Sequence, residues 1–368
     1  MDYNRRKLLK DAGVAAIGLS AGTSAWLTPA RAAAENIVAV TWGGPHVKAN
    51  QAAADDFTKT TGIDVVWELH EGASTNILSK IKAMWPTVRH DLVQATDPVF
   101  YSMMKEEGWL ADVDDVEGIN DVHPKMVDTF RDVNGKAKVV PVLIGTTYYG
   151  YRTDMVPNPI RKIEDLLDPS LKGKVGILDP SLYTCLPYVS MALEFGGSEH
   201  DMEPGWAFLK KLAESGNVGQ VLKSDVDTIN ALTTGSIAVA YTGIGNWGKI
   251  SKSVPTTLCN RMPESKGMKA FLFTLGWAIV NGPRTAEAKR FASFLLKPEH
   301  NQQYAADVTA SPANRKAQVA PELENLLIST AEDIDRYGYF PDFPYISSQM
   351  ESWTQRFETE IMPIIRGR

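Results

Sequence analysis

Residues 37–68 read IVAVTWGGPHVKANQAAADDFTKTTGIDVVWE, and this stretch decides the fold. The β-branched run at 37–41 predicts a strand, the turn-forming residues at 42–45 predict a loop, and the Ala-rich stretch that follows predicts a helix. Gly62 ends that helix, and 63–68 predicts a second strand. A strand, a helix and a strand in this order are typical of a βαβ unit with parallel strands.

The same alternation continues along the rest of the chain. Helices are predicted at 77–85 and from Pro98 to Gly108, with a strand between them at 91–95. A second alternating block has predicted strands at 147–152, 175–178 and 237–241 and helices near 183–195 and 204–215. From residue 285 the chain is mainly helical, with periodic segments at 286–296 and 350–365. The fold class is therefore α/β, with two lobes that are each a mostly parallel sheet flanked by helices.

Two extended apolar segments separate the blocks and are the candidate hinge strands. They are residues 139–144 and 271–280. We expect lobe 1 to comprise 35–143 together with 275–368, and lobe 2 to comprise 144–274.

The composition excludes several classes of protein. The 368 residues are 44% hydrophobic and 22% charged, which are ordinary globular proportions. The net charge is −6 and no basic stripe is present, so nucleic acid is not an expected partner. No uninterrupted apolar run reaches eighteen residues, which argues against a polytopic membrane protein.

Residues 1–34 have the features of an export signal. Arg5 and Arg6 open a basic segment, a mildly apolar run follows from 12 to 27, and small residues at Ala32–Ala34 provide a cleavage point. The adjacent arginines and the Gly- and Ala-rich apolar run are typical of a twin-arginine signal, and an ordinary signal is the alternative. Since no lipobox cysteine lies near the cleavage point, we expect a free periplasmic protein.

The sequence does not decide whether the two cysteines form a disulfide. Cys185 and Cys259 could form one disulfide in an oxidising compartment, or they could be two separate buried thiols.

Candidate binding residues lie within or just after the predicted strands. In open α/β sheets, ligands bind beyond the carboxyl ends of the strands, where backbone N–H groups and helix N-termini point outward. Aromatic residues recur at these positions, which suits a cleft that stacks on a ligand. The candidate ligand-binding residues are Trp42, Gly43, Gly44, Asp97, Tyr148, Asp179, Tyr183, Tyr241, Asn246 and Trp277.

Four segments, in order along the chain, resemble bacterial extracellular solute-binding proteins. Residues 57–65 (FTKTTGIDV) are similar to the F-x-x-x-T-G-I-x-V that follows the first helix of that family, and 141–154 to its hinge strand. Residues 171–180 (LKGKVGILDP) resemble its entry to the second lobe, and 287–296 followed by 311–314 (SPAN) resemble the return to the first. The binding components of polyamine and ferric-iron ABC importers are the most similar groups.

The resemblance implies a type II periplasmic binding fold and a function in binding. Two lobes joined by hinge strands close over a small solute, and the closed form is presented to an ABC permease of the inner membrane. A monomer without cofactor or metal, and without catalytic residues, is the expectation.

The chain departs from both groups in ways that bear on the solute. The iron binders carry adjacent tyrosines where this chain has Gly245 and Asn246, which argues against ferric iron. The polyamine binders carry a second acid where this chain has Ile244, so a monocation or another amine-bearing or polar solute fits better than a long polyamine. Asp97 and Asp179 are the possible cation anchors, although Asp97 is equally suited to cap the helix at Pro98.

Besides a receptor for ferric iron, two alternatives to an amine receptor remain. An anionic solute could bind to Arg152, Arg315 and helix N-termini. The second alternative is an exported enzyme with the same fold, because fold does not determine function. The sequence gives little support for an enzyme, since it has no His-Glu-x-x-His, Cys-x-x-Cys, Gly-x-Ser-x-Gly or phosphate-loop motif. Its six histidines have no spacing that suggests a shared metal.

Overall fold

A computed structural model describes residues 36–70, 76–324 and 326–367 of the chain. The expected signal segment at 1–34 lies outside the described residues. None of the helices in these ranges has both the length and the apolar character needed to cross a membrane.

The first half of the sheet is built as the sequence predicts. β1 (Ile37–Thr41) pairs in parallel with β2 (Val65–Leu69) and with β3 (Leu92–Thr96). The connecting helices are α1 (Pro45–Thr61) and α2 (Asn76–Met84), and α3 (Asp97–Met104) follows β3. Gly62 ends α1 in the left-handed conformation at φ 76°, a geometry that glycine adopts without strain. This confirms the βαβ unit.

The second half repeats the pattern. β5 (Val175–Leu178) pairs in parallel with β6 (Val218–Leu222) and with β7 (Val239–Gly243). Four helices accompany these strands, and they are α5 (Leu186–Glu194), α6 (Glu203–Ser215), α7 (Asp225–Thr234) and α8 (Ile244–Ile250).

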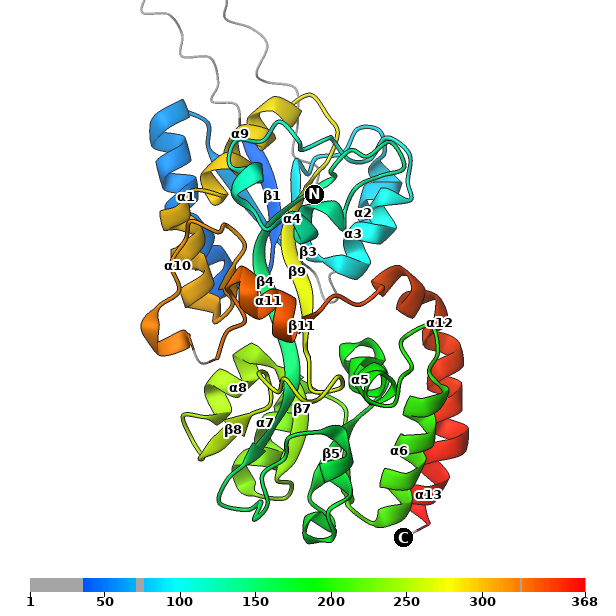
Figure 1. The fold of residues 1–368 in the computed structure, drawn as a ribbon. Coiled ribbons are helices and arrows are strands. Elements are labelled where there is room, and N and C mark those ends of the chain that lie inside the picture. Colours follow the sequence, from blue (N-terminus) through cyan, green and yellow to red (C-terminus); the bar gives the residue numbers. More distant parts are fainter. Residues whose placement is uncertain (1–35, 71–75, 325, 368) are drawn as a thin grey trace, which may run out of the picture. The chain divides into compact units, whose positions relative to one another are not determined.

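Two long antiparallel strands run through both halves and join them. β4 (Val139–Arg152) and β9 (Ala270–Ile279) contain both candidate hinge segments, and they pair with each other from Val139 to Thr147. β3 pairs with β9, and β4 pairs with β7, so the described strands form one sheet in the order β2-β1-β3-β9-β4-β7-β5-β6. The sheet is thus parallel in each lobe and antiparallel at the centre, where the chain crosses (Figure 1).

Shorter strands extend the central sheet. β8 (Thr256–Leu258) and β10 (Ser311–Pro312) pair with β4, and β11 (Gly338–Tyr339) pairs with β9. The remaining helices of the first lobe are α4 (Pro124–Asp128), α9 (Thr285–Leu295) and α10 (Pro298–Val308). α11 (Ala331–Tyr337) precedes β11 and returns the chain across the centre of the sheet.

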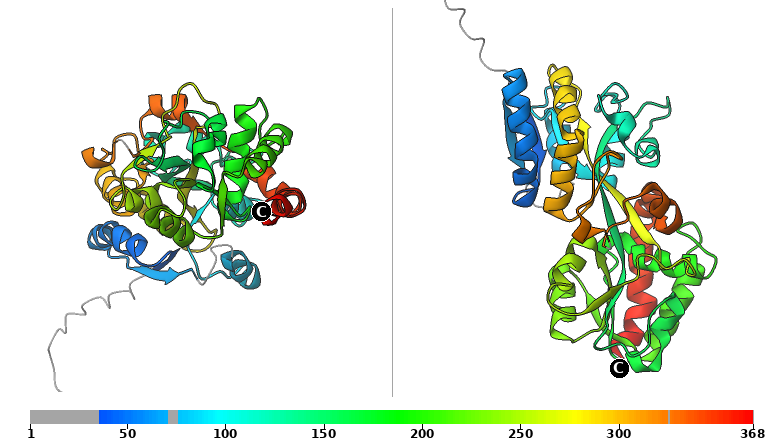
Figure 2. Two further views of the ribbon diagram at one scale, coloured as in Figure 1. Left: turned by 90° about the horizontal axis from the view of Figure 1, so that it is seen from below. Right: turned by 60° about the vertical axis from the view of Figure 1, so that its left-hand side comes forward.

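The C-terminal helices α12 (Phe343–Arg356) and α13 (Met362–Arg366) contact both lobes. α12 packs on α3, while α13 packs on α6 (Figure 2). The rings of Tyr188 and Phe357 stack at 5.7 Å, and Arg356 pairs with Glu203. Residues 343–366 therefore contact helices of both lobes. The lobe boundaries stay predictions.

The core is continuous between the lobes. One cluster of buried apolar side chains includes Phe57 of α1, Trp277 of β9, and Tyr188 of α5. Cys185 and Cys259 are two separate buried thiols, which settles the alternatives in favour of free cysteines.

Candidate functional site

A cavity of about 330 Å³ lies where strand ends and helix starts of both lobes meet. The first lobe contributes the start of α1 and the end of α10, and the second contributes the starts of α7 and α8 and the loop after β5. β4 and β9 supply the rest of the wall. The full lining is His46, Gly145, Thr146, Tyr183, Asp225, Gly243, Ile244, Gly245, Asn246, Phe273, Leu275, Val308, Thr309 and Ala310.

A glycine in β4 makes room for the apolar wall. A Cβ atom at Gly145 would lie 2.1 Å from the ring of Phe273, which pairs with it across the sheet. Any side chain at position 145 would therefore displace the Phe273 ring from its place in the lining. Phe273 and Leu275 form an apolar surface on β9.

The Tyr183 hydroxyl forms hydrogen bonds with three polar groups of the second lobe. It donates to Asp225 Oδ1 at 2.6 Å. It accepts the backbone N–H of Gly243 at 3.1 Å and the side-chain amide of Asn246 at 3.2 Å. Burial, and then the Asp225 charge, raise the pKa of Tyr183 well above its usual value. The phenol therefore stays protonated and connects three elements by hydrogen bonds.

The backbone that carries Tyr183 is strained. Tyr183, Thr184 and Cys185 have φ values of 56°, 47° and 62°, which places three consecutive non-glycine residues in the left-handed region. Each such residue costs about 1–2 kcal/mol relative to a right-handed conformation. Burial of Cys185 and the hydrogen bonds of Tyr183 hold this turn ahead of α5.

His46 is the ionisable side chain that the first lobe brings to the cavity. Its Nδ1 lies 2.7 Å from the hydroxyl of Tyr304, and its ring packs at 5.1 Å from that of Trp42. Burial lowers the pKa of His46 below its usual value, so the imidazole is neutral near pH 7.

The electrostatics of the cavity follow from these groups. His46 and Tyr183 are neutral, and no Lys or Arg is found among the lining residues within the described ranges. The carboxylate of Asp225 is the one formal charge that they carry. Asp225 is exposed, and its Oδ2 is left to accept hydrogen bonds from a solute.

The structure brings part of the predicted set to this cavity. Tyr183 and Asn246 line it. Trp42 lies beside His46, and Gly43 and Gly44 are exposed at the start of α1. Asp179 binds the Ser181 hydroxyl and backbone, within the loop that leads to Tyr183.

The other predicted residues are buried in the wall behind the cavity or away from it. Tyr241 hydrogen-bonds Thr147 at 2.6 Å and has its ring 6.3 Å from that of Tyr183. Tyr148 donates to the carbonyl of Leu326, and Trp277 lies in the core. These three side chains are at most 1% exposed.

Asp97 is neither exposed nor the N-cap of α3. Thr96 occupies the N-cap position, and the Oδ2 of Asp97 accepts the backbone N–H of Thr274 at 2.7 Å. Burial raises its pKa to about 7.

His46 and Asp225 are the ionisable lining residues that the sequence analysis does not predict. His46 follows the predicted Gly43-Gly44 loop by two residues, but the histidines were weighed only as metal ligands. Asp225 follows β6, a strand that the sequence did not predict, and Ser224 caps its helix by accepting the Asp227 N–H. A Ser-Asp pair at the start of a helix after an apolar strand was the available signal.

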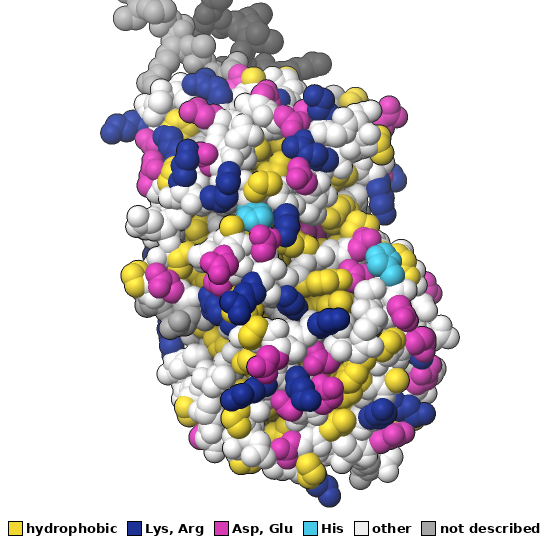
Figure 3. Space-filling model, viewed as in Figure 1, with side chains coloured by type: hydrophobic (Ala, Val, Ile, Leu, Met, Phe, Trp, Pro, Cys, Tyr) yellow, Lys and Arg dark blue, Asp and Glu magenta, His cyan; other side chains and the backbone are white. Residues whose placement is uncertain are grey.

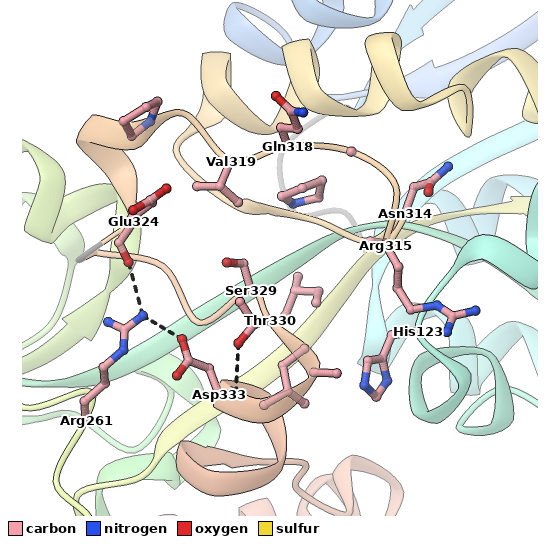
Figure 4. Close-up of a pocket in the computed structure, with 17 residues that line it drawn as sticks. His123, Arg261, Asn314, Arg315, Gln318, Val319, Glu324, Ser329, Thr330 and Asp333 are labelled. Carbon is pink, nitrogen blue, oxygen red and sulfur yellow. Dashed lines mark hydrogen bonds and ion pairs between the residues drawn. The ribbon is translucent and has the colours of Figure 1, made fainter.

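A second, larger cavity of about 900 Å³ lies between α11, the loop after β10 and residues near α4 (Figure 4). None of the ten candidate ligand-binding residues lines it, although Arg315, the possible anion contact, does. Two of its charged groups are paired, because Arg261 binds Asp333 as well as the carbonyls of Glu324 and Leu327. The smaller cavity therefore fits the expected binding position better.

The arginines proposed for an anion are engaged elsewhere. Arg152 forms a two-point pair with Asp154 and donates to backbone carbonyls at 232 and 233. Arg315 donates to carbonyls at 120 and 121 and lines the larger cavity. Neither lines the smaller cavity.

Charge on the molecular surface is mixed in sign. On the face in Figure 3, basic and acidic side chains alternate with apolar ones. Within the described ranges, no group of three or more His, Cys, Asp or Glu side chains is placed to hold a metal ion.

Comparison with known proteins gives solved structures of the same fold. An ABC transporter protein from Clostridium perfringens is 21% identical with a TM-score of 0.73, over 88% of this chain and 99% of that one. The spermidine/putrescine ABC transporter substrate-binding protein PotD from Streptococcus pneumoniae is 19% identical with a TM-score of 0.68, over 87% and 100%. Iron-bound HitA from Pseudomonas aeruginosa is 18% identical with a TM-score of 0.66, over 87% and 98%. The expected type II periplasmic binding fold is confirmed.

A family model covers most of the chain. The model described as bacterial extracellular solute-binding protein matches residues 52–327. No curated protein matches the sequence.

Proposed function

Because the chain belongs to the bacterial extracellular solute-binding protein family, we propose that it binds an amine-bearing solute in the cavity of about 330 Å³ and delivers it to an ABC permease of the inner membrane. Its function is that of a substrate-binding protein of an ABC transporter. The proposal includes export through the segment 1–34, a monomer in the periplasm, and closure of the two lobes by bending of β4 and β9. It includes no catalytic step.

One observation carries the choice of solute. The Asp225 carboxylate is the only formal charge that the described lining residues bring to the cavity, and it lies beside apolar and neutral polar groups. A protonated amine would meet a charge-assisted acceptor there, while a carboxylate or phosphate alone would meet like charge. The spermidine/putrescine specificity in the name of one structural relative is consistent with an amine.

The alternatives are less well supported by the same residues. Ferric iron requires deprotonated or anionic ligands, and Tyr183 is a neutral phenol bound to Asp225. An anionic solute would need the cationic side chains that are engaged outside this cavity. Cys185 and Cys259 are buried, and burial raises the pKa of each thiol to about 12, which opposes a nucleophilic role.

The first experiment identifies the class of solute. The exported, processed protein is screened by thermal unfolding against amines, amino acids, sugars, carboxylates, phosphate and ferric salts. A bound solute raises the melting temperature by mass action, and a receptor leaves it chemically unchanged. Shifts restricted to solutes that bear an amine support the proposal. Shifts restricted to carboxylates, phosphate or ferric salts, or consumption of the solute, contradict it.

A pair of glycine variants tests the placement of the site. A Cβ atom at Gly245 meets nothing within 4 Å, and Gly245 lines the cavity, so we expect the side chain of Gly245→Leu to occupy part of the cavity. Gly282 has equally open surroundings outside the cavity, and Gly282→Leu is the matched control. We expect Gly245→Leu to abolish the ligand-induced shift and Gly282→Leu to retain it. Equal shifts in both variants would place the site elsewhere.

A further inference from the structure

His46 has one ring nitrogen engaged in the core and one left for the cavity. Its Nδ1 lies 2.7 Å from the hydroxyl of Tyr304, a side chain that is only 3% exposed. Nε2 makes no hydrogen bond to any of the described residues. Because Nδ1 is directed toward the buried phenol and His46 lines the cavity, Nε2 is the ring nitrogen that remains to bind a solute.

A chain of hydrogen bonds runs from Tyr304 into the first lobe. The side-chain amide nitrogen of Gln94 lies 2.8 Å from the Tyr304 hydroxyl. The amide oxygen of Gln94 hydrogen-bonds the hydroxyl of Thr41. Thr41 and Gln94 are fully buried, so water does not complete these bonds.

The buried position of Thr41 determines which group donates in each of these hydrogen bonds. If the Thr41 hydroxyl donates to Gln94, then the Gln94 amide donates to Tyr304. The Asn50 side chain also hydrogen-bonds this phenol, and with its amide as a second donor the phenol proton goes to His46. In the reverse direction the Gln94 amide would donate to Thr41, and the Thr41 proton would have no acceptor among the described residues. A buried donor without a partner costs about 1–3 kcal/mol, which favours the first direction.

The direction of these hydrogen bonds determines the tautomer of the His46 imidazole. With Nδ1 accepting from Tyr304, a neutral His46 carries its proton on Nε2. Burial lowers the pKa of His46, which keeps the ring neutral. The first lobe therefore offers a neutral N–H donor to the cavity, while the second lobe offers the carboxylate acceptor of Asp225.

We propose that His46 Nε2–H binds an acceptor oxygen of the solute, so that the solute carries a carboxylate or carbonyl group as well as the amine that Asp225 binds. This inference rests on the proposed function and names its solute class. An ω-amino acid or an ω-amino amide has both groups. A protonated diamine has only donors, and its second ammonium group would meet the Nε2–H donor face to face.

The tautomer is tested first, without any solute. In the exported protein labelled with 15N-histidine, the imidazole nitrogen shifts of His46 report which nitrogen carries the proton. We expect a neutral ring with Nε2–H near pH 7, and Tyr304→Phe is expected to remove the fixed Nδ1 signature. A neutral Nδ1–H ring or an imidazolium in the wild type would overturn the inference.

The solute class is tested with matched pairs of probes. ω-Amino acids and α,ω-diamines of equal length, from three to six carbons, are titrated calorimetrically into the wild type, His46→Phe and His200→Phe. His200 is exposed, lies outside the cavity, and has its ring 4.2 Å from that of Tyr345, so His200→Phe is a matched control. We expect the best ω-amino acid to bind about tenfold more tightly than its matched diamine in the wild type and in the control. His46→Phe is expected to lose that preference.

Failure of the inference and failure of the proposed function give different binding results. If the wild type prefers the diamine, or if His46→Phe keeps the preference, the inference is wrong while an amine receptor still stands. If no amine of either series binds and a non-amine solute does, both are wrong. If His46→Phe does not fold, the wild-type preference and the imidazole tautomer decide the question.

Discussion

The hydroxyl of Tyr183 donates a hydrogen bond of 2.6 Å to the carboxylate of Asp225 inside the cavity. This contact ties the strained turn ahead of α5 to the first residue of α7. Because Gly243 and Asn246 donate to the same hydroxyl, one phenol holds the polar wall of the second lobe in place. Asp225 is thereby positioned before any solute arrives, which lowers the cost of ordering it on binding.

Removal of that hydroxyl should destabilise the protein. In Tyr183→Phe, the Gly243 N–H and the Asn246 amide both lose an acceptor, and we expect the free energy of unfolding to fall by about 1–3 kcal/mol. Urea denaturation measures it. Tyr345→Phe is the control, because its hydroxyl bonds none of the described residues, and it is expected to change little. Equal losses in the two variants would mean that the Tyr183 hydrogen bonds contribute nothing specific.

The strained turn should be relieved by a residue that tolerates the left-handed region. Thr184 is β-branched and has φ 47°, whereas asparagine adopts such values more readily. We expect Thr184→Asn to raise the free energy of unfolding by about 1 kcal/mol. Thr129→Asn is the control, since φ of −55° at that position leaves no such strain to relieve. A loss of stability in Thr184→Asn would show that the threonine makes a compensating contact.

Asp97 should make stability depend on pH. Burial raises its pKa to about 7 in the folded protein, against an ordinary value of 3.8 in the unfolded chain. The folded state therefore holds a proton that the unfolded state releases, so its contribution to stability is present at low pH and is lost as pH rises from about 4 to 7. The loss amounts to about 4 kcal/mol.

Asp97→Asn isolates this contribution. The asparagine oxygen can still accept the Thr274 N–H, but the side chain no longer titrates. The difference in unfolding free energy between the variant and the wild type should therefore grow in favour of the variant between pH 4 and 7. Parallel pH profiles for the two proteins would show that Asp97 has an ordinary pKa.

Export should depend on the paired arginines. In the double variant Arg5→Lys, Arg6→Lys, the basic character is kept but the twin-arginine signature is lost. We expect the unprocessed chain to remain in the cytoplasm, as measured by cell fractionation and intact mass, while Lys10→Arg is exported and processed. Normal processing of the double variant would point to an ordinary signal.

The architecture could be predicted from the sequence because it depends on patterns along the chain. The β-branched runs, the Gly62 stop and the apolar crossing segments at 139–144 and 271–280 all act locally, and the structure has strands and helix ends at these places. The terminal helices were harder to place. Their apolar faces pack on α3 and α6, and neither partner is identifiable from periodicity.

The site could be predicted only in part, because strand ends determine where residues meet but not which side chains face the cavity. Tyr241 and Tyr148 have the expected positions after or within a strand, yet their rings are buried behind the lining. His46 lies in the first turn of α1 and Asp225 is the first residue of α7, and packing of the two lobes brings these helix starts to one cavity. Their contacts, with Tyr304 and Tyr183, span 258 and 42 residues of sequence, a separation that no local pattern reveals.

The most direct test of the account is a calorimetric titration of the best amine-bearing solute into the wild type, Asp225→Asn and Asp227→Asn. Both aspartates are exposed in the first turn of α7, but only Asp225 lines the cavity. We predict one site per chain, an affinity at least tenfold weaker in Asp225→Asn, and an unchanged affinity in Asp227→Asn. Equal affinity in Asp225→Asn and the wild type would contradict the assignment of this cavity as an amine site.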